Sequence, residues 1–238
     1  GSLNGQKIIN ITVEEKPTGE ISAGAGVGTS GGSVMFGVKE NNFLGRGVAF
    51  GSNITLNAES LKGVISLNNP NYKGTNRSLN LSAQNVSTDR LTDYGYKSNK
   101  TGITIGSGFE LYDDLYLNRG LSVSTEKLDT SSKASANIKS QEGTYFDTFF
   151  NYTLDYDKRN QKYQPTEGYR SRFSQKIPLI NKSNTLTNTY DYKTYSVWFN
   201  ENITSLGFYA EATNSLNGKN VKLSDRIFLS PSKLRGFE

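Results

Sequence analysis

The sequence contains no cysteine and no histidine, and these two absences exclude many kinds of catalytic site. Without cysteine there is no disulfide framework, no thiolate nucleophile and no cysteine-rich metal site. Without histidine there is no Ser-His-Asp triad, and both the commonest general base and the commonest metal ligand are missing. We therefore expect a protein that is not an enzyme, with no catalytic residue, no cofactor and no metal site.

Long apolar runs are also missing. No stretch approaches the roughly 18 apolar residues of a membrane-spanning helix, and residues 1–4 lack the charged and apolar regions of a signal peptide. A chain of this kind is either not exported or an internal piece of a longer protein. Apolar residues make up 34% of the chain, yet aromatic residues reach 11%, and 24 glycines stand against 5 prolines. Since disordered chains are poor in aromatic residues, this composition favours β-structure with many tight turns.

The charge pattern gives no sign of a nucleic-acid partner. The 27 basic and 22 acidic residues are mixed along the chain, whereas a nucleic-acid binder concentrates its Lys and Arg residues on one surface. The net charge of +5 indicates a mildly basic, solvated surface. We expect no nucleic acid among the partners.

Apolar residues alternate with polar or small residues along nearly the whole chain. From Glu20 to Gly28, every second residue is Ile, Ala or Val, and the residues between them are Glu, Ser or Gly. This period of two is typical of a β-strand with one apolar face. Eleven such rows begin at Ile21, Val34, Val48, Leu61, Leu79, Ile103, Leu115, Phe146, Tyr169, Tyr195 and Leu206. Each segment is about ten residues long and is bounded by turn-forming residues.

Two all-β architectures fit this pattern, a soluble sandwich and a transmembrane antiparallel barrel. Sandwich strands are usually shorter and their core is more apolar, whereas barrel strands of roughly 9–11 residues alternate between lipid and a wet lumen. The very polar second face favours the barrel. If the first strand runs outward, the external connections include residues 87–99, 126–143 and 178–188. Most of the opposite, periplasmic connections are shorter, with 157–168 as the main exception.

The number of strands predicts a partial barrel. Bacterial single-chain barrels have an even number of strands, and eleven is odd. An open sheet would also leave two unpaired edges in lipid, which is not viable. We therefore expect a fragment whose remaining strands lie outside this sequence.

Two motifs have ordinary structural explanations. Gly24, Gly26 and Gly28 are spaced as in a dinucleotide-binding loop, but an alternating strand follows them instead of the required helix. The carboxylate pairs Asp113-Asp114 and Asp155/Asp157 lie at turns or strand ends, where Asp commonly stabilises the turn itself. A protease or lipase built on a barrel is a remaining alternative.

Other motifs are specific in their combination and order. Thr18-Gly19 leads into Gly24, Gly26, Gly28-Thr29 and Gly37-Val38, and then into Asn42-Phe43-Leu44-Gly45-Arg46-Gly47. Asn69-Pro70-Asn71-Tyr72 follows the fourth strand, Pro165-Thr166-Glu167-Gly168 the eighth, and Leu234-Arg235-Gly236-Phe237 the eleventh. Over essentially the whole chain, this set resembles the BamA family of the bacterial surface antigen (POTRA-barrel) superfamily. Leu234 departs from the family's more usual Val or Ile.

The resemblance implies a domain organisation and a location. The family barrel has about sixteen strands, of which this chain would supply the first eleven. Residues 1–17 would end a periplasmic POTRA domain, with Ile8–Lys16 as its last strand. Residues 18–238 would form the N-terminal part of an outer-membrane β-barrel and end inside the sixth extracellular loop. The N-terminal side would face the periplasm.

The resemblance also implies a function, which is the assembly and insertion of β-barrel proteins into the bacterial outer membrane. The first strand would form a lateral seam that templates client strands: Gly19, Glu20, Ile21, Ser22, Ala23, Gly24, Ala25, Gly26, Val27 and Gly28. The family turn motifs would comprise Asn42, Leu44, Gly45, Gly47, Asn69, Pro70, Tyr72, Pro165 and Gly168. Arg235, in the sixth-loop motif Leu234–Phe237, would either stabilise the barrel or act directly in insertion.

The implied partners are unfolded outer-membrane protein clients, outer-membrane lipids and the accessory lipoproteins of an assembly complex. Alternatives share parts of the pattern. A TamA-like or two-partner secretion transporter has the same barrel and loop motif, a passive porin needs neither the Arg-Gly-Phe loop nor a periplasmic strand, and a soluble β-rich adhesin would need no membrane.

Overall fold

The computed structural model describes residues 10–14, 16–28, 31–181, 184–199 and 202–227. In these ranges the chain is almost entirely β-structure, and no helix there has the length and apolar character needed to cross a membrane. The strands are β1 (Gly19–Gly28), β2 (Gly31–Phe43), β3 (Val48–Asn57), β4 (Ser60–Asn69), β5 (Arg77–Arg90), β6 (Tyr96–Tyr112), β7 (Leu115–Thr130), β8 (Gly143–Asp157), β9 (Gly168–Asn181), β10 (Thr185–Trp198) and β11 (Asn202–Ser215). The short helices are η1 (Tyr72–Gly74), α1 (Ala136–Lys139) and η2 (Leu223–Asp225).

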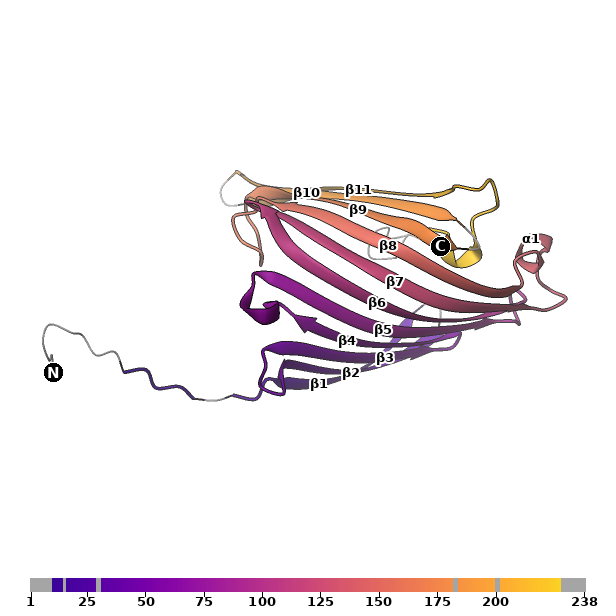
Figure 1. Cartoon of the computed structure of the whole chain (residues 1–238), viewed down its shortest axis with the longest axis horizontal. Helices are drawn as coiled ribbons and strands as arrows, with labels where there is room; N and C mark the ends of the chain where they lie inside the picture. The colour runs from indigo at the N-terminus through magenta and orange to yellow at the C-terminus, as the bar shows by residue number, and fades with distance from the viewer. Residues whose placement is uncertain (1–9, 15, 29–30, 182–183, 200–201, 228–238) are drawn as a thin grey trace, which may run out of the picture.

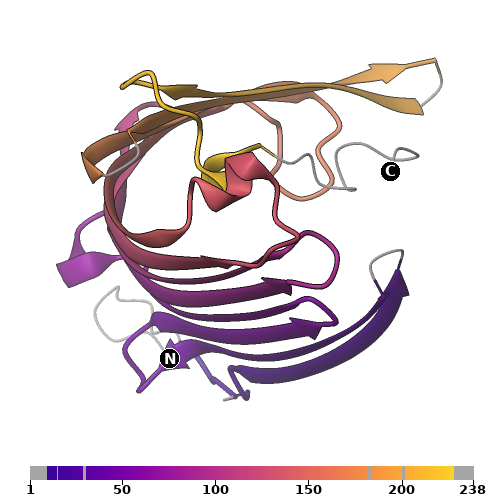
Figure 2. The ribbon, with the colours of Figure 1, turned by 90° about the vertical axis from the view of Figure 1, so that its right-hand side faces the viewer.

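All eleven strands belong to one antiparallel sheet in which the spatial order equals the chain order, from β1 to β11. Figure 1 shows the strands side by side, and Figure 2 shows the sheet curling into an open trough with β1 and β11 at its two edges. This arrangement confirms the prediction of an all-β, partial antiparallel barrel.

The two faces of the sheet differ in chemistry. Cross-strand partners share a face, and one such row runs through Leu81, Ile105, Leu121 and Phe150. Ile105 is 51% exposed and Leu121 is 48% exposed. The alternating polar residues face the inside of the trough, which also receives the chain after β11 (Figure 2). We call these the convex and the concave face.

Several strands are longer than the sequence predicts. Strands β6 and β7 have 17 and 16 residues, and the extra residues lie where β5, β6 and β7 continue past the apolar rows. The predicted connection 87–99 shrinks to residues 91–95, and 126–143 shrinks to 131–142. These extensions are largely polar, with the buried Leu128 of β7 as an exception, and a hydrogen-bonded ladder does not require an apolar face. Ion pairs such as Lys97–Asp89, at 3.3 Å, support them.

The predicted apolar row of β10 is wrong. Tyr190 packs beside Phe208 with ring centroids 6.2 Å apart, and Tyr192 packs beside Tyr169 at 5.9 Å, so these two tyrosines lie on the convex face. Tyr195 and Val197 therefore point to the concave side. The sequence did not separate the faces because β10 carries tyrosine on both of them.

The chain before β1 has no regular structure where it is described. Residues 10–14 and 16–18 form no strand and are exposed. A POTRA strand at Ile8–Lys16 would pair with residues upstream of this chain, so the assignment of residues 1–17 stays a prediction.

Candidate functional site

The predicted seam strand coincides with β1, which has the predicted bounds Gly19–Gly28. It pairs with β2 along its whole length, and no other strand of the described chain pairs with it. Its other edge has no partner strand among the described residues, and the backbone N–H and C=O groups on that edge are available to a further strand. Ile21 and Val27 are 83% and 93% exposed on this strand.

Gly24 and Gly26 of β1 are not required by local packing. A Cβ at Gly24 would come no closer than 3.9 Å to Met35, and one at Gly26 no closer than 3.7 Å to the hydroxyl of Ser33. Both are ordinary van der Waals distances. Gly37 of β2 is different, because a Cβ there would lie 2.6 Å from Asn53 and Ser22. The absence of side chains at Gly24 and Gly26 thus mainly reduces side-chain contact between β1 and β2, which weakens the edge strand.

The first turn motif shapes the β2–β3 turn. Leu44, Gly45 and Gly47 all have positive φ values, of 55°, 68° and 64°. Asn42 closes the turn twice, since its Oδ1 accepts from the backbone N of Gly47 at 2.7 Å and its carbonyl accepts from Gly45 at 2.9 Å. These residues act as a structural unit.

The second turn motif shapes the β4–β5 connection. Asn69 Oδ1 accepts from the backbone N of Asn71 at 3.1 Å. Tyr72 begins η1, and its carbonyl accepts from the backbone and the hydroxyl of Thr75 at 3.1 and 2.6 Å. Pro70 lines the cavity described below.

The third turn motif closes the loop between β8 and β9. Gly168 has φ +91°, and a Cβ there would lie 2.1 Å from the carbonyl oxygen of Lys158. No other residue type fits this approach. Pro165 lies next to Thr166, whose backbone N–H donates to Asn160 Oδ1 at 3.2 Å. This hydrogen bond closes the loop.

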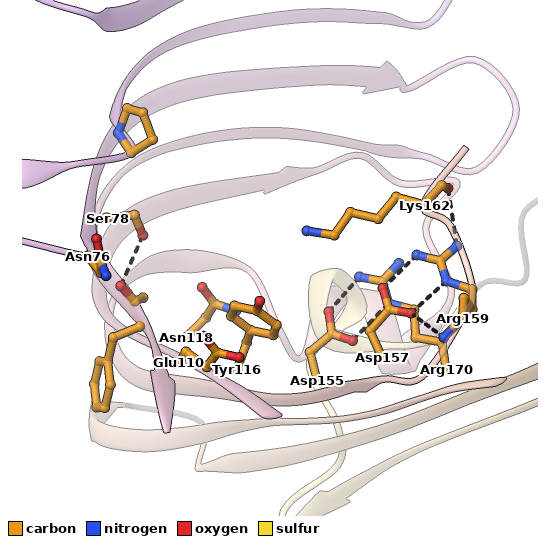
Figure 3. Close-up of a pocket in the computed structure, with 13 residues that line it drawn as sticks. Asn76, Ser78, Glu110, Tyr116, Asn118, Asp155, Asp157, Arg159, Lys162 and Arg170 are labelled. Carbon is orange, nitrogen blue, oxygen red and sulfur yellow. Dashed lines mark hydrogen bonds and ion pairs between the residues drawn. The ribbon is translucent and has the colours of Figure 1, made fainter. Parts of the chain in front are cut away.

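A polar cavity of about 490 Å³ lies on the concave side between β5–β8 and this loop (Figure 3). Asp155 accepts from Arg170 at 2.8 Å and from Arg172 at 3.1 Å. Asp157 accepts two hydrogen bonds from Arg159, both of 2.7 Å. The hydrogen bond to Asp157 raises the pKa of Arg159 above its usual value. Both carboxylates are neutralised in this way, so the pair Asp155/Asp157 is structural.

The best-defined polar cluster was not predicted from the sequence. After β11 the chain returns into the trough as the lumenal segment, residues 216–227 (Figure 2). Lys222 of this segment places its Nζ 2.5 Å from Asp147 of β8 and 2.9 Å from Glu126 of β7. All three side chains are at most 4% exposed. A buried charge is tolerated only when it is paired and hydrogen-bonded, so this contact fixes the segment against the wall.

Neighbouring residues complete the cluster. Asp225 accepts from Thr185 of β10 at 3.0 Å and lies 3.7 Å from Lys176 of β9. Ser224 donates to Glu126 at 2.7 Å. Burial alone would lower the pKa of Lys222, but the charges of Glu126 and Asp225, with hydrogen bonds to Asp147 and Glu126, raise it overall.

The sixth-loop motif, Leu234, Arg235, Gly236 and Phe237, lies outside the described residues. The described part of the chain contains no group of acidic residues arranged to hold a metal ion.

A curved antiparallel sheet with an apolar convex face, a polar concave face and an inward-folded segment defines the class of outer-membrane β-barrels. The Omp85 superfamily domain matches residues 42–238, and the chain belongs to this superfamily. Fold and family together make it part of a bacterial outer-membrane β-barrel.

Two similar proteins refine this assignment. The curated "Outer membrane protein assembly factor BamA" of Neorickettsia risticii (strain Illinois) is 26% identical over 256 residues, which cover 99% of this chain and 32% of the relative. The crystal structure of BamA from Haemophilus ducreyi lacking POTRA domains 1–3 matches 87% of this chain with a TM-score of 0.72 and 23% identity, and so supports the fold. The match covers 43% of that solved chain. This chain therefore spans about a third of the curated relative.

Proposed function

We propose that the chain is part of an outer-membrane protein assembly factor, and that β1 forms the seam at which client strands are templated. The observation that carries this proposal is the sparse side-chain contact between β1 and β2 at Gly24 and Gly26, in a chain that belongs to the Omp85 superfamily. The similarity to the Neorickettsia risticii relative, an outer membrane protein assembly factor, supports the same activity.

The argument for templating rests on hydrogen bonding in lipid. The bilayer core offers no water, so each unpaired backbone group there costs several kcal/mol. A free β1 edge therefore needs a partner strand. A client segment with matching alternation can add to the edge by β-augmentation. The glycines at 24 and 26 favour exchange of that partner, because they weaken the contact of β1 with its neighbours.

The proposal includes the orientation and the partners of the barrel. The N-terminal side, with the turns at residues 44–47, 70–76, 113–114 and 158–167, faces the periplasm. Unfolded outer-membrane proteins arrive from that side as clients, outer-membrane lipids surround the convex face, and accessory lipoproteins complete the complex. No covalent step is required, so the proposed activity is not enzymatic.

A reconstitution experiment tests the activity. The full-length protein is placed in liposomes, an unfolded barrel client is added with a periplasmic chaperone, and client folding is followed by its heat-modifiable gel shift. We expect folding faster than in empty liposomes. Unchanged folding together with steady ion conductance would indicate a pore or secretion channel.

A disulfide lock tests the seam separately. A cysteine at Ala23 or Ala25 is oxidised to a cysteine on the last strand of the full-length barrel, and client folding should stop. The matched control ties Ala23 to its partner Phe36 on β2, which constrains β1 but leaves its outer edge free. The control should retain client folding. Normal assembly with the seam locked would refute templating while leaving the assembly activity intact.

A further inference from the structure

The apolar convex face carries two arginines, Arg77 at the start of β5 and Arg119 in β7. Arg77 is the cross-strand partner of Phe109, and Arg119 is the partner of Tyr152. Phe109 is in turn the partner of Leu117. Both arginines therefore share the face of the apolar rows, and both are exposed.

One aromatic ring positions both guanidinium groups. The Cζ atoms of Arg77 and Arg119 lie 5.6 and 5.5 Å from the centroid of the Phe109 ring. Distances within about 6 Å allow a cation–π attraction. Arg77 approaches from directly across the β5–β6 pair, and Arg119 approaches diagonally from β7, so three neighbouring strands build one cationic patch.

The positive charges of this patch are not neutralised within the described chain. Arg77 and Arg119 form no ion pair there, whereas Arg90, Arg159, Arg170 and Arg172 each pair with a carboxylate. Two like charges on one ring repel each other, so the arrangement favours a bridging anion.

The surroundings restrict what that anion is. On the extracellular-loop side of the patch, the same face carries the exposed apolar residues Leu81, Ile105 and Leu121. Arg77 lies at the end of β5 that adjoins the turn 70–76, so the patch sits at the rim of the apolar belt. Guanidinium groups match phosphate oxygens in geometry and charge. A ligand with a phosphate at the rim and an acyl chain along the belt meets both requirements.

We propose that Arg77 and Arg119, positioned by Phe109, bind the phosphate of an anionic glycerophospholipid on the outer surface of the barrel. The acyl chains pack along Ile105 and Leu121. This site is independent of the seam and of the assembly activity.

Retention of lipid by the purified full-length protein tests the site. The protein in a non-ionic detergent is given equal amounts of phosphatidylglycerol and phosphatidylcholine with the same acyl chains, and bound lipid is counted by native mass spectrometry. We expect preferential retention of phosphatidylglycerol that excess inorganic phosphate does not displace. R77Q or R119Q should each weaken it about fivefold, and the double variant about 25-fold.

A matched control removes the same charge elsewhere. Arg46 lies in the β2–β3 turn and Lys62 on the concave side of β4, both exposed, and the variant R46Q/K62Q should retain phosphatidylglycerol like the parent protein. Equal losses in both double variants would mean a general charge effect and would overturn the proposal. Unchanged retention in folded R77Q/R119Q, confirmed by its heat-modifiable gel shift, would also overturn it.

Discussion

At the scale of single residues, Gly168 is the most constrained position of the predicted motifs. Any other residue would place a Cβ 2.1 Å from the carbonyl of Lys158 at φ +91°. We expect Gly168→Ala in the full-length protein to lose at least about 1–2 kcal/mol from the backbone conformation alone. The temperature at which the heat-modifiable gel shift is lost measures this. Gly63→Ala is the control, since a Cβ added at Gly63 would have no atom within 4 Å. Equal melting of the two variants would contradict the steric argument.

Lys222 is the residue on which the lumenal segment depends. Lys222→Met leaves Asp147 buried without its cation and leaves Glu126 with only the more distant Lys100, at 4.0 Å. Removal of one partner of a buried pair typically costs about 3–5 kcal/mol. We expect the segment to become accessible to protease in this variant, whereas the exposed Lys219→Met should stay resistant. The triple variant K222M/E126Q/D147N removes all three buried charges and should recover much of the protection. A resistant single variant would show that the ion cluster does not hold the segment.

The same lysine predicts a response to alkaline pH. Its pKa is raised above the usual 10.5, because the charges of Glu126 and Asp225 outweigh the effect of burial. A raised pKa means that Lys222 contributes its full stabilisation below pH 10.5 and loses it as the pH rises through the higher folded value. Protease sensitivity of residues 216–227 should therefore rise in a step above pH 10.5. The step should be absent from K222M, and an identical step in that variant would assign it to another group.

At the scale of strands, the period of two predicted β1 to its terminal residues, because polar or glycine positions alternate there with Ile, Ala and Val. The same pattern gave the wrong face for Tyr195, because β10 carries tyrosine on both faces. It also missed the extensions of β6 and β7, because hydrogen-bonded ladders continue without an apolar row. The cluster around Lys222 was missed for another reason. Its contacts join residues 75 positions apart, such as Lys222 and Asp147, and only the register of the sheet brings Glu126 and Asp147 together. Charged residues on the concave positions of β7, β8 and β9 were the available signal.

The low stability of β1 in the sheet is a property of the whole strand. Substitutions of its glycines can raise this stability without altering the register of β1 with β2. Gly24→Ala and Gly26→Ala fit the available space, since the nearest atoms lie 3.9 and 3.7 Å from the added Cβ. Each glycine costs a strand about 0.5–1 kcal/mol relative to alanine. We expect the double variant to show slower hydrogen exchange in β1 and, under the proposed function, slower client folding. Slower hydrogen exchange with unchanged client folding would show that the weakness of β1 does not contribute to the activity.

At the scale of the whole molecule, the sheet is an open trough with an apolar outside and two strand edges, β1 and β11, that have no further partner among the described strands. In a bilayer every unpaired N–H and C=O group along those edges costs several kcal/mol. The lumenal segment braces β7 to β10 from inside but does not satisfy either edge. We therefore expect the 238-residue chain expressed alone to give no heat-modifiable monomer in detergent, whereas the full-length protein gives one. Semi-denaturing gel electrophoresis of both, with and without boiling, makes the comparison. A stable, heat-modifiable monomer of the isolated chain would mean that the edges close on each other or are otherwise satisfied, and that β1 is then not free to receive a client strand.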